Sequence, residues 1–148
     1  MKVFCYFNLH THLWSLKALD GARKGLVVAH AESLELADCE MRVSEAGRQR
    51  VLQEKRKNVH AGIVGTVVRA GGIRWRYRDV EELFLLTWPE APNCRWTAFS
   101  YNPYKGKTFA ERAEPYRPVL RAQTVRLDHK LGTYYFNDGL NWRPKTSR

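Results

Sequence analysis

Cysteine is scarce in this sequence, and no cysteine motif is present. The three cysteines are widely spaced, their number is odd, and no two of them form a CxxC pair. Zinc modules need closely spaced ligand pairs, and disulfide frameworks need an even set of cysteines. Neither is indicated here. We therefore expect a reducing environment, in which Cys5, Cys39 and Cys94 act as small buried apolar side chains.

Long apolar stretches are missing as well. The longest, around residues 83–86, is far too short to span a bilayer. The first residues alternate between apolar and polar side chains and lack the apolar core of a signal peptide. These absences predict a cytoplasmic protein that makes no contact with a membrane.

The glycines do not form a phosphate-binding loop. The Walker, GxGxxG and GxSxG patterns are absent from the sequence, and these motifs would predict nucleotide hydrolysis, dinucleotide binding or a serine nucleophile. No set of metal ligands with a recognised spacing occurs either. We therefore expect no cofactor and no bound metal, and the sequence does not indicate an enzyme.

Acidic residues are few compared with basic ones. Asp and Glu number 15 against 25 Lys and Arg, which gives a net charge of +10 and a pI near 9.8. Such a charge attracts polyanions over long distances, so nucleic acid, nucleotides and acidic protein surfaces are the candidate partners. The chain of 148 residues has the usual size of one domain. We predict one globular basic domain at 1–140 and a flexible basic tail at 141–148, with the oligomeric state left open.

Strand-like segments make up most of the chain. Alternating or β-branched patterns predict strands at residues 2–9, 13–19, 26–31, 58–69, 73–78, 95–101, 119–127 and 133–136. Between residues 33 and 43 the apolar positions change parity, which indicates a turn or bulge at Ala37-Asp38. We predict a mainly β (α+β) fold, a small β-sandwich or barrel-like sheet with one surface helix.

The one predicted helix covers residues 45–57. Ser44 is a good N-cap, and the residues that follow it are mostly strong helix formers. Gly47 is expected to weaken this helix by about 1 kcal/mol relative to alanine. The apolar stripe is narrow, so the helix is expected to lie on the surface.

Basic side chains cluster between residues 42 and 78. This stretch holds ten basic and two acidic residues, a local net charge of +8. Arginine suits phosphate because its planar fork donates two parallel hydrogen bonds. A solvated face that aids solubility, or a surface that complements an acidic partner, would explain the same charges. The predicted anion-binding residues are Arg48, Arg50, Lys55, Arg56, Lys57, Arg74, Arg76 and Arg78.

The segment 73–78 has a clear alternation within that cluster. Its arginines share one side of the predicted strand, and Ile73, Trp75 and Tyr77 share the other. The two aromatic residues could offer stacking surfaces for bases, but their position opposite the arginines favours a place in the core.

A histidine pair is the main candidate for chemistry. On an extended strand, His10 and His12 would point the same way, as two metal ligands or an acid–base pair require. In a hairpin turn they would only decorate it. The alternative function is therefore a phosphodiesterase or nuclease that uses these two histidines.

Three stretches of the chain resemble a family of small, uncharacterised proteins encoded by tailed bacteriophages. They are residues 3–10 with Trp14-Ser15 close behind, residues 46–61, and residues 101–105. The resemblance implies expression in the cytoplasm of an infected bacterium and transfers no catalytic residue. In that setting the leading hypothesis is an accessory protein that binds nucleic acid or a nucleotide signal of host immunity, with a counter-defence role. A protein–protein inhibitor of a host enzyme is a further alternative.

Overall fold

The computed structural model describes residues 2–56, 59–81, 96–112, 117–128 and 133–137. Several predicted features lie outside these residues. They are Cys94, Lys57, the apolar segment around residues 83–86 and the tail at 141–148.

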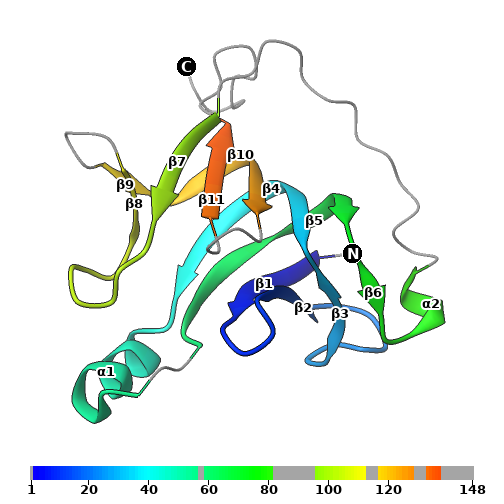
Figure 1. Ribbon diagram of the computed structural model, residues 1–148, viewed down its shortest axis with the longest axis horizontal. Coiled ribbons are helices and arrows are strands. Elements are labelled where there is room, and N and C mark those ends of the chain that lie inside the picture. Colours follow the sequence, from blue (N-terminus) through cyan, green and yellow to red (C-terminus); the bar gives the residue numbers. More distant parts are fainter. Residues whose placement is uncertain (1, 57–58, 82–95, 113–116, 129–132, 138–148) are drawn as a thin grey trace.

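The described chain forms one antiparallel sheet with two helices, which confirms the predicted mainly β class (Figure 1). Its spatial order is β6-β3-β2-β1-β5-β4-β10-β11-β7-β8-β9. The strands are β1 (Lys2–Asn8), β2 (Leu13–Ala18), β3 (Val27–Ala31), β4 (Ser33–Val43), β5 (Ala61–Gly71), β6 (Arg74–Trp75), β7 (Trp96–Ser100), β8 (Phe109–Glu111), β9 (Pro118–Val119), β10 (Arg121–Asp128) and β11 (Thr133–Asn137).

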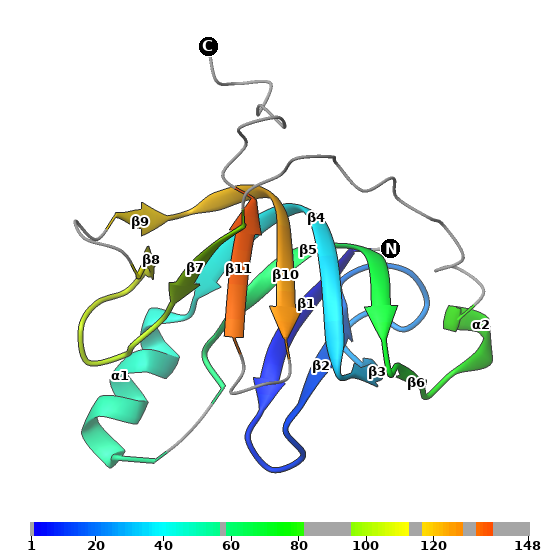
Figure 2. The ribbon, with the colours of Figure 1, turned by 45° about the horizontal axis from the view of Figure 1, so that its top comes forward.

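The sheet is strongly curled. Trp14 on β2 and Tyr134 on β11 have four strands between them in the sheet order, yet their ring centroids are 5.2 Å apart. A flat sheet would hold these strands well apart, because neighbouring strands are spaced by about 4.8 Å. The two views of the ribbon show β10, β11 and β7 folded over towards β1 and β2 (Figures 1 and 2). The sheet is therefore barrel-like, and its concave side holds the core.

Irregularities in β4 help the sheet to bend. The register between β4 and β5 shifts between Glu35 and Leu36 and again between Ala37 and Glu40, and Asp38 has a φ of 53°. This confirms the bulge predicted at Ala37-Asp38. Bulges increase local twist and bend the strand that carries them, so β4 can turn around the core.

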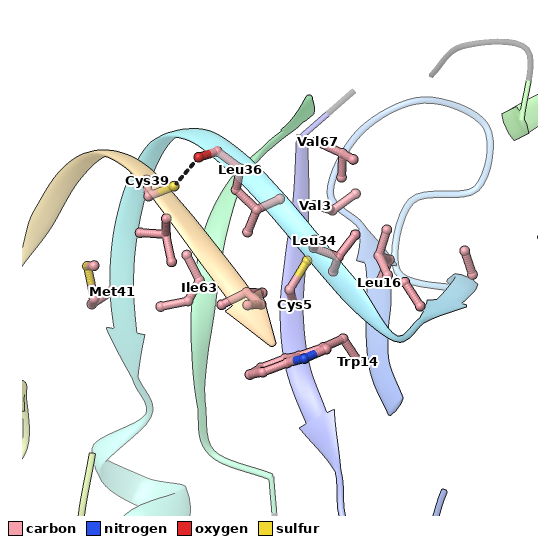
Figure 3. Packing of buried hydrophobic residues seen from close by; sticks show 14 of the residues in the cluster. Val3, Cys5, Trp14, Leu16, Leu34, Leu36, Cys39, Met41, Ile63 and Val67 are labelled. Carbon is pink, nitrogen blue, oxygen red and sulfur yellow. Dashed lines mark hydrogen bonds between the residues drawn. The ribbon is translucent and has the colours of Figure 1, made fainter. Parts of the chain in front are cut away.

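The core is a continuous apolar cluster that draws on strands from β1 to β11 (Figure 3). Leu36, Ile63 and Trp14 are fully buried within it. Cys5 and Cys39 are buried there too, and the Cys39 thiol donates a hydrogen bond to the Leu36 carbonyl at 3.2 Å. Burial raises the pKa of both thiols. Both are therefore the small buried side chains that the sequence predicted.

Helix α1 (Glu45–Glu54) connects β4 to β5 and begins at the predicted N-cap. The Ser44 hydroxyl accepts a hydrogen bond from the Gly47 amide at 3.2 Å. The helix ends three residues before the predicted end. Lys55 adopts a left-handed conformation, with φ at 55°, and its amide bonds back to the Val51 carbonyl, which closes the last turn.

The predicted strand at 73–78 is much shorter than expected. Only Arg74 and Trp75 form β6, although the Arg76 amide still donates to the Val28 carbonyl at 2.9 Å. Arg78 begins a second helix, α2 (Arg78–Glu81), which the sequence did not predict. Neither helix of the described chain has the length and apolar character needed to cross a membrane.

Candidate anion-binding surfaces

Three arginines lie on and directly after β6, the strand at one edge of the sheet. Arg74, Arg76 and Arg78 are all exposed, whereas the residues between and before them pack against the core cluster. The predicted alternation of this segment is therefore present even though regular pairing ends early. We call Arg74, Arg76 and Arg78 the arginine edge.

The segment that carries the arginine edge is held in place by contacts with Arg23. The Arg23 guanidinium lies 4.0 Å from the centre of the Tyr77 ring and is 3.3 Å from a carboxylate oxygen of Asp79. Asp79 is thus already paired. Within the described ranges, none of the three edge arginines forms an ion pair. The edge therefore presents three positive charges on an ordered backbone.

The pKa of His30 is affected by the positive charge of this edge. It lies opposite Arg74 in the register of β3 and β6, and its Nδ1 is 3.2 Å from the Ser15 hydroxyl oxygen. Burial lowers the pKa of His30 below its usual value, and the Arg76 guanidinium lowers it further. A second positive charge at this place is therefore unfavourable.

The basic residues of α1 have a different role. Arg48 is mostly buried, with 13% of its side chain exposed. Its Nε donates to the Pro103 carbonyl at 2.8 Å, and its Nη1 donates to Glu45 at 2.8 Å. Arg48 thus ties α1 to the segment after β7. Arg50, Lys55 and Arg56 are exposed, and Arg56 lies 4.0 Å from Glu54.

The helix and the arginine edge lie at opposite ends of the molecule in both views of the ribbon (Figures 1 and 2). They are separated by β5, whose 11 residues extend for about 35 Å along the strand. The prediction of one Arg/Lys-rich face, shared by the helix and the segment at 73–78, is therefore wrong. The basic side chains that are close in sequence form two separate groups in space.

The two candidate histidines lie in the turn between β1 and β2 and are exposed. His12 has a φ of 58°, its amide donates to the Asn8 carbonyl at 2.8 Å, and its ring packs edge-on against Phe7. The extended geometry that would direct both imidazoles to one side is not adopted. Among the described residues, no group of three or more possible metal-ligating side chains occurs.

A groove on the convex side of the sheet was not found from the sequence. It has a volume of about 760 Å³. We call it the outer groove, and its charged and aromatic lining comprises Glu35, Arg69, Trp96, Arg126, Asp128 and Tyr135. The neighbours of Glu35, Leu34 and Leu36, belong to the core, so Glu35 points to the opposite side of the sheet.

The strand register places the polar groups of the outer groove side by side. Glu35 on β4 pairs with Arg69 on β5 on one side and with Arg126 on β10 on the other. Arg126 in turn pairs with Tyr135 on β11. The only local signal in the sequence is a charged residue between two leucines, because Glu35 and Arg126 are 91 residues apart in the chain.

Comparisons with known proteins agree with the resemblance seen in the sequence. Residues 1–135 match the family described as the Mycobacterium phage L5 gene 82 protein. The chain is 35% identical to the gene 82 protein of Mycobacterium phage L5 over 133 residues, which cover 86% of this chain and 90% of that protein. No solved structure matches the chain. The predicted relationship to small phage proteins is confirmed, and the chain belongs to the family of the Mycobacterium phage L5 gene 82 protein.

Proposed function

We propose that this protein binds nucleic acid through its backbone phosphates and that the arginine edge is the contact surface. The observation that supports the proposal is the alternation at residues 73–78. Three exposed guanidiniums project from a segment whose remaining side chains pack on the core. The protein acts in this proposal as a binding protein and not as an enzyme.

The spacing of the arginine edge suits a repeating polyanion. Arg74 and Arg76 are two residues apart on nearly extended backbone, so their Cα atoms are separated by about 6.6 Å. Long side chains at this spacing can reach neighbouring phosphates of one nucleic acid strand. Because phosphate contacts carry no sequence information, we expect the binding to depend little on base sequence.

Charge favours the same partner over both long and short distances. The net charge of +10 attracts a polyanion before contact. At contact, the nearest acidic residue in the segment, Asp79, is paired with Arg23. Asp79 therefore does not neutralise the edge arginines. Guanidinium groups lose hydration at low cost and bind phosphate in a bidentate manner.

A binding panel tests the proposal. Nuclease-treated protein is titrated with labelled single-stranded DNA, duplex DNA, RNA and a cyclic nucleotide, at low and at physiological salt. We expect the polymers to bind and binding to weaken linearly on a log–log plot against salt. Loss of all binding at physiological salt would contradict the proposal. A pull-down from nuclease-treated host lysate would then test an acidic protein partner instead.

Two triple variants separate local contact from overall charge. Arg74→Ala, Arg76→Ala and Arg78→Ala together should reduce the salt slope for duplex DNA by about 0.9 for each phosphate that the variant no longer neutralises. The matched control is Arg50→Ala, Lys55→Ala and Arg56→Ala on α1, which removes the same charge at the other end of the molecule. Its slope should stay near that of the unmodified protein. An equal decrease in both variants would contradict binding at the arginine edge.

A further inference from the structure

Two aromatic rings lie on the convex side of β1, away from the core. Their neighbours along the strand pack in or against the core cluster, so the alternation of the strand directs Phe4 and Tyr6 to the opposite side. Neither ring belongs to the core cluster. Both are half-buried, and their centroids are 6.0 Å apart. They therefore form a pair of partly exposed rings on the outer face of the sheet.

The first of these rings packs on the neighbouring strand β5. A Cβ built at Gly62 would lie 2.7 Å from Cζ of Phe4, closer than such atoms approach in folded proteins. Glycine therefore leaves the space that the ring fills. A ring that is already held in place loses little conformational freedom when a ligand stacks on it.

Strand pairing connects the aromatic pair to the arginine edge. Tyr6 is the register partner of Ser15 on β2, and Ser15 is that of His30 on β3. His30 is in turn the partner of Arg74 on β6. Direct partners on antiparallel strands lie on the same side of the sheet, so these side chains form one row. Ser15 is fully buried in the row, with its hydroxyl oxygen 3.2 Å from Nδ1 of the half-buried His30 ring.

Positive charge is in excess on and around this row. Lys17 is the register partner of Phe4, and Lys2 precedes that ring by two residues on the same strand. The exposed basic side chains are Lys2, Lys17, Arg42, Arg74 and Arg76. The acidic side chains at its borders are Asp20, Glu32 and Glu40, of which Glu40 lies 3.6 Å from Arg42. Five basic groups therefore stand against three acidic ones, which leaves a surface that suits an anionic partner.

We infer that Phe4, Tyr6 and His30 form a stacking platform for the bases of a single-stranded nucleic acid. Bases stack on phenylalanine, tyrosine and histidine rings. The inference rests on the proposed function, because the same strand continues from its phosphate contacts at the arginine edge. Three strand spacings separate β6 from β1, about 14 Å in all, which about four stacked nucleotides span. The bases of a duplex stack on each other instead, so a duplex reaches the arginine edge but not the platform.

Fluorescence anisotropy at physiological salt tests the platform with a labelled DNA strand of about 12 nucleotides and with the corresponding duplex. Tyr6→Leu and Phe4→Leu keep an apolar side chain but remove the ring. Each should weaken binding of the single strand about tenfold and that of the duplex less than about twofold. Tyr104→Leu is the matched control, because Tyr104 is exposed next to Pro103, which is bonded to Arg48 of α1. Its affinity for both probes should stay within about twofold of the unmodified protein.

The two proposals fail in distinguishable ways. Equal losses for single strand and duplex in the platform variants, or no loss for the single strand, would overturn the platform and leave the arginine edge in place. The triple variant Arg74→Ala, Arg76→Ala and Arg78→Ala should weaken both probes. Undiminished duplex binding by that triple variant would contradict the proposed function instead.

An observation on the unmodified protein covers the case in which a platform variant fails to fold. The ring resonances of Tyr6 and Phe4 should shift when the single strand is added and should stay in place when the duplex is added. Those of Phe99, which is buried in the core, should move with neither probe. Shifts confined to the segment 74–78 would overturn the inference.

Discussion

Gly47 lies in the first turn of α1, and its missing side chain makes room for His60. A Cβ built at this position would lie 2.7 Å from the Cβ of His60, closer than such atoms approach in folded proteins. Close packing against His60 therefore favours glycine at this position, and this effect outweighs the poor helix propensity of glycine. His60 itself is anchored, since its Nε2 is 2.8 Å from the Tyr101 hydroxyl.

Gly47→Ala should consequently destabilise the protein. Alanine improves helix propensity by about 1 kcal/mol, but overpacking costs about 1–3 kcal/mol, and we expect the free energy of unfolding to fall by up to about 2 kcal/mol. Urea denaturation measures it. The control is Gly106→Ala, where no atom lies within 4 Å of the added Cβ, and where the change should stay within about 0.5 kcal/mol. A more stable Gly47→Ala protein would show that the contact yields without cost.

His30 links the arginine edge to pH. Its folded-state pKa lies below the usual value of 6.5, first because of burial and then because of Arg76. Arg76→Gln should therefore raise the pKa of His30 in an NMR titration, while burial keeps it below 6.5. Arg78→Gln is the control and should leave it unchanged. An unchanged pKa in Arg76→Gln would place the two side chains too far apart to interact.

The same shift makes stability depend on pH. Below 6.5 the unfolded chain takes up a proton at His30 more readily than the folded chain does. The contribution of His30 to the free energy of unfolding is therefore fully present above pH 6.5. It is lost as the pH falls from 6.5 through the lower folded-state pKa. Arg76→Gln should reduce this loss. Urea denaturation at several pH values between 7 and 5 measures the slope.

Helix α1 is attached to the sheet by few contacts. Its buried residues are Gly47 and Val51, so apolar packing alone holds it weakly. Arg48 supplies an additional tie through its hydrogen bond to the Pro103 carbonyl, whereas its hydrogen bond to Glu45 lies within the helix. Two of the stretches that carry the resemblance to phage proteins, residues 46–61 and 101–105, therefore meet at this helix.

Arg48→Ala should loosen α1. A hydrogen bond from a charged group contributes about 1.5–3 kcal/mol, and we expect the free energy of unfolding to fall by that amount. Hydrogen exchange of the α1 amides should become faster relative to that of the amides in the sheet. Arg50→Ala, in the same helix but exposed, should change stability by no more than about 0.5 kcal/mol. Similar effects of both substitutions would mean that the Arg48 hydrogen bonds contribute nothing.

The curl of the whole sheet brings distant strands into contact. Trp14 meets Tyr134 at 5.2 Å, and Tyr134 meets Phe99 at 5.1 Å and Phe109 at 5.4 Å. These rings form a continuous aromatic layer in the concave interior. The two halves of the sheet are thus joined through one shared cluster.

A double-mutant cycle tests this closure. Trp14→Leu and Tyr134→Leu should each destabilise the protein, and their coupling energy should be about 0.5–1.5 kcal/mol, as for other aromatic pairs in contact. Trp14→Leu combined with Val51→Ala on α1 should be additive, because Val51 lies outside the core cluster that contains Trp14. Additivity of the Trp14 and Tyr134 substitutions would show that the two strands do not meet.

Several features could be predicted from the sequence because their causes are local. The strand segments, the Ser44 cap, the bulge near Asp38 and the alternation at residues 73–78 each depend on a few neighbouring residues. Boundaries were less accurate: α1 ends early because Lys55 turns left-handed, and β6 gives way to α2 at Arg78.

Only the tertiary structure decided which charged groups lie together. A strand of 11 residues separates α1 from the arginine edge, and Arg48 is used to hold the helix. The outer groove depends on strand register, which brings Glu35 beside Arg69 and Arg126 from positions far away in the chain. Composition alone determined that the protein is basic. Where its charge gathers was decided by strand pairing, because pairing partners are set by packing across the whole sheet and not by neighbours in sequence.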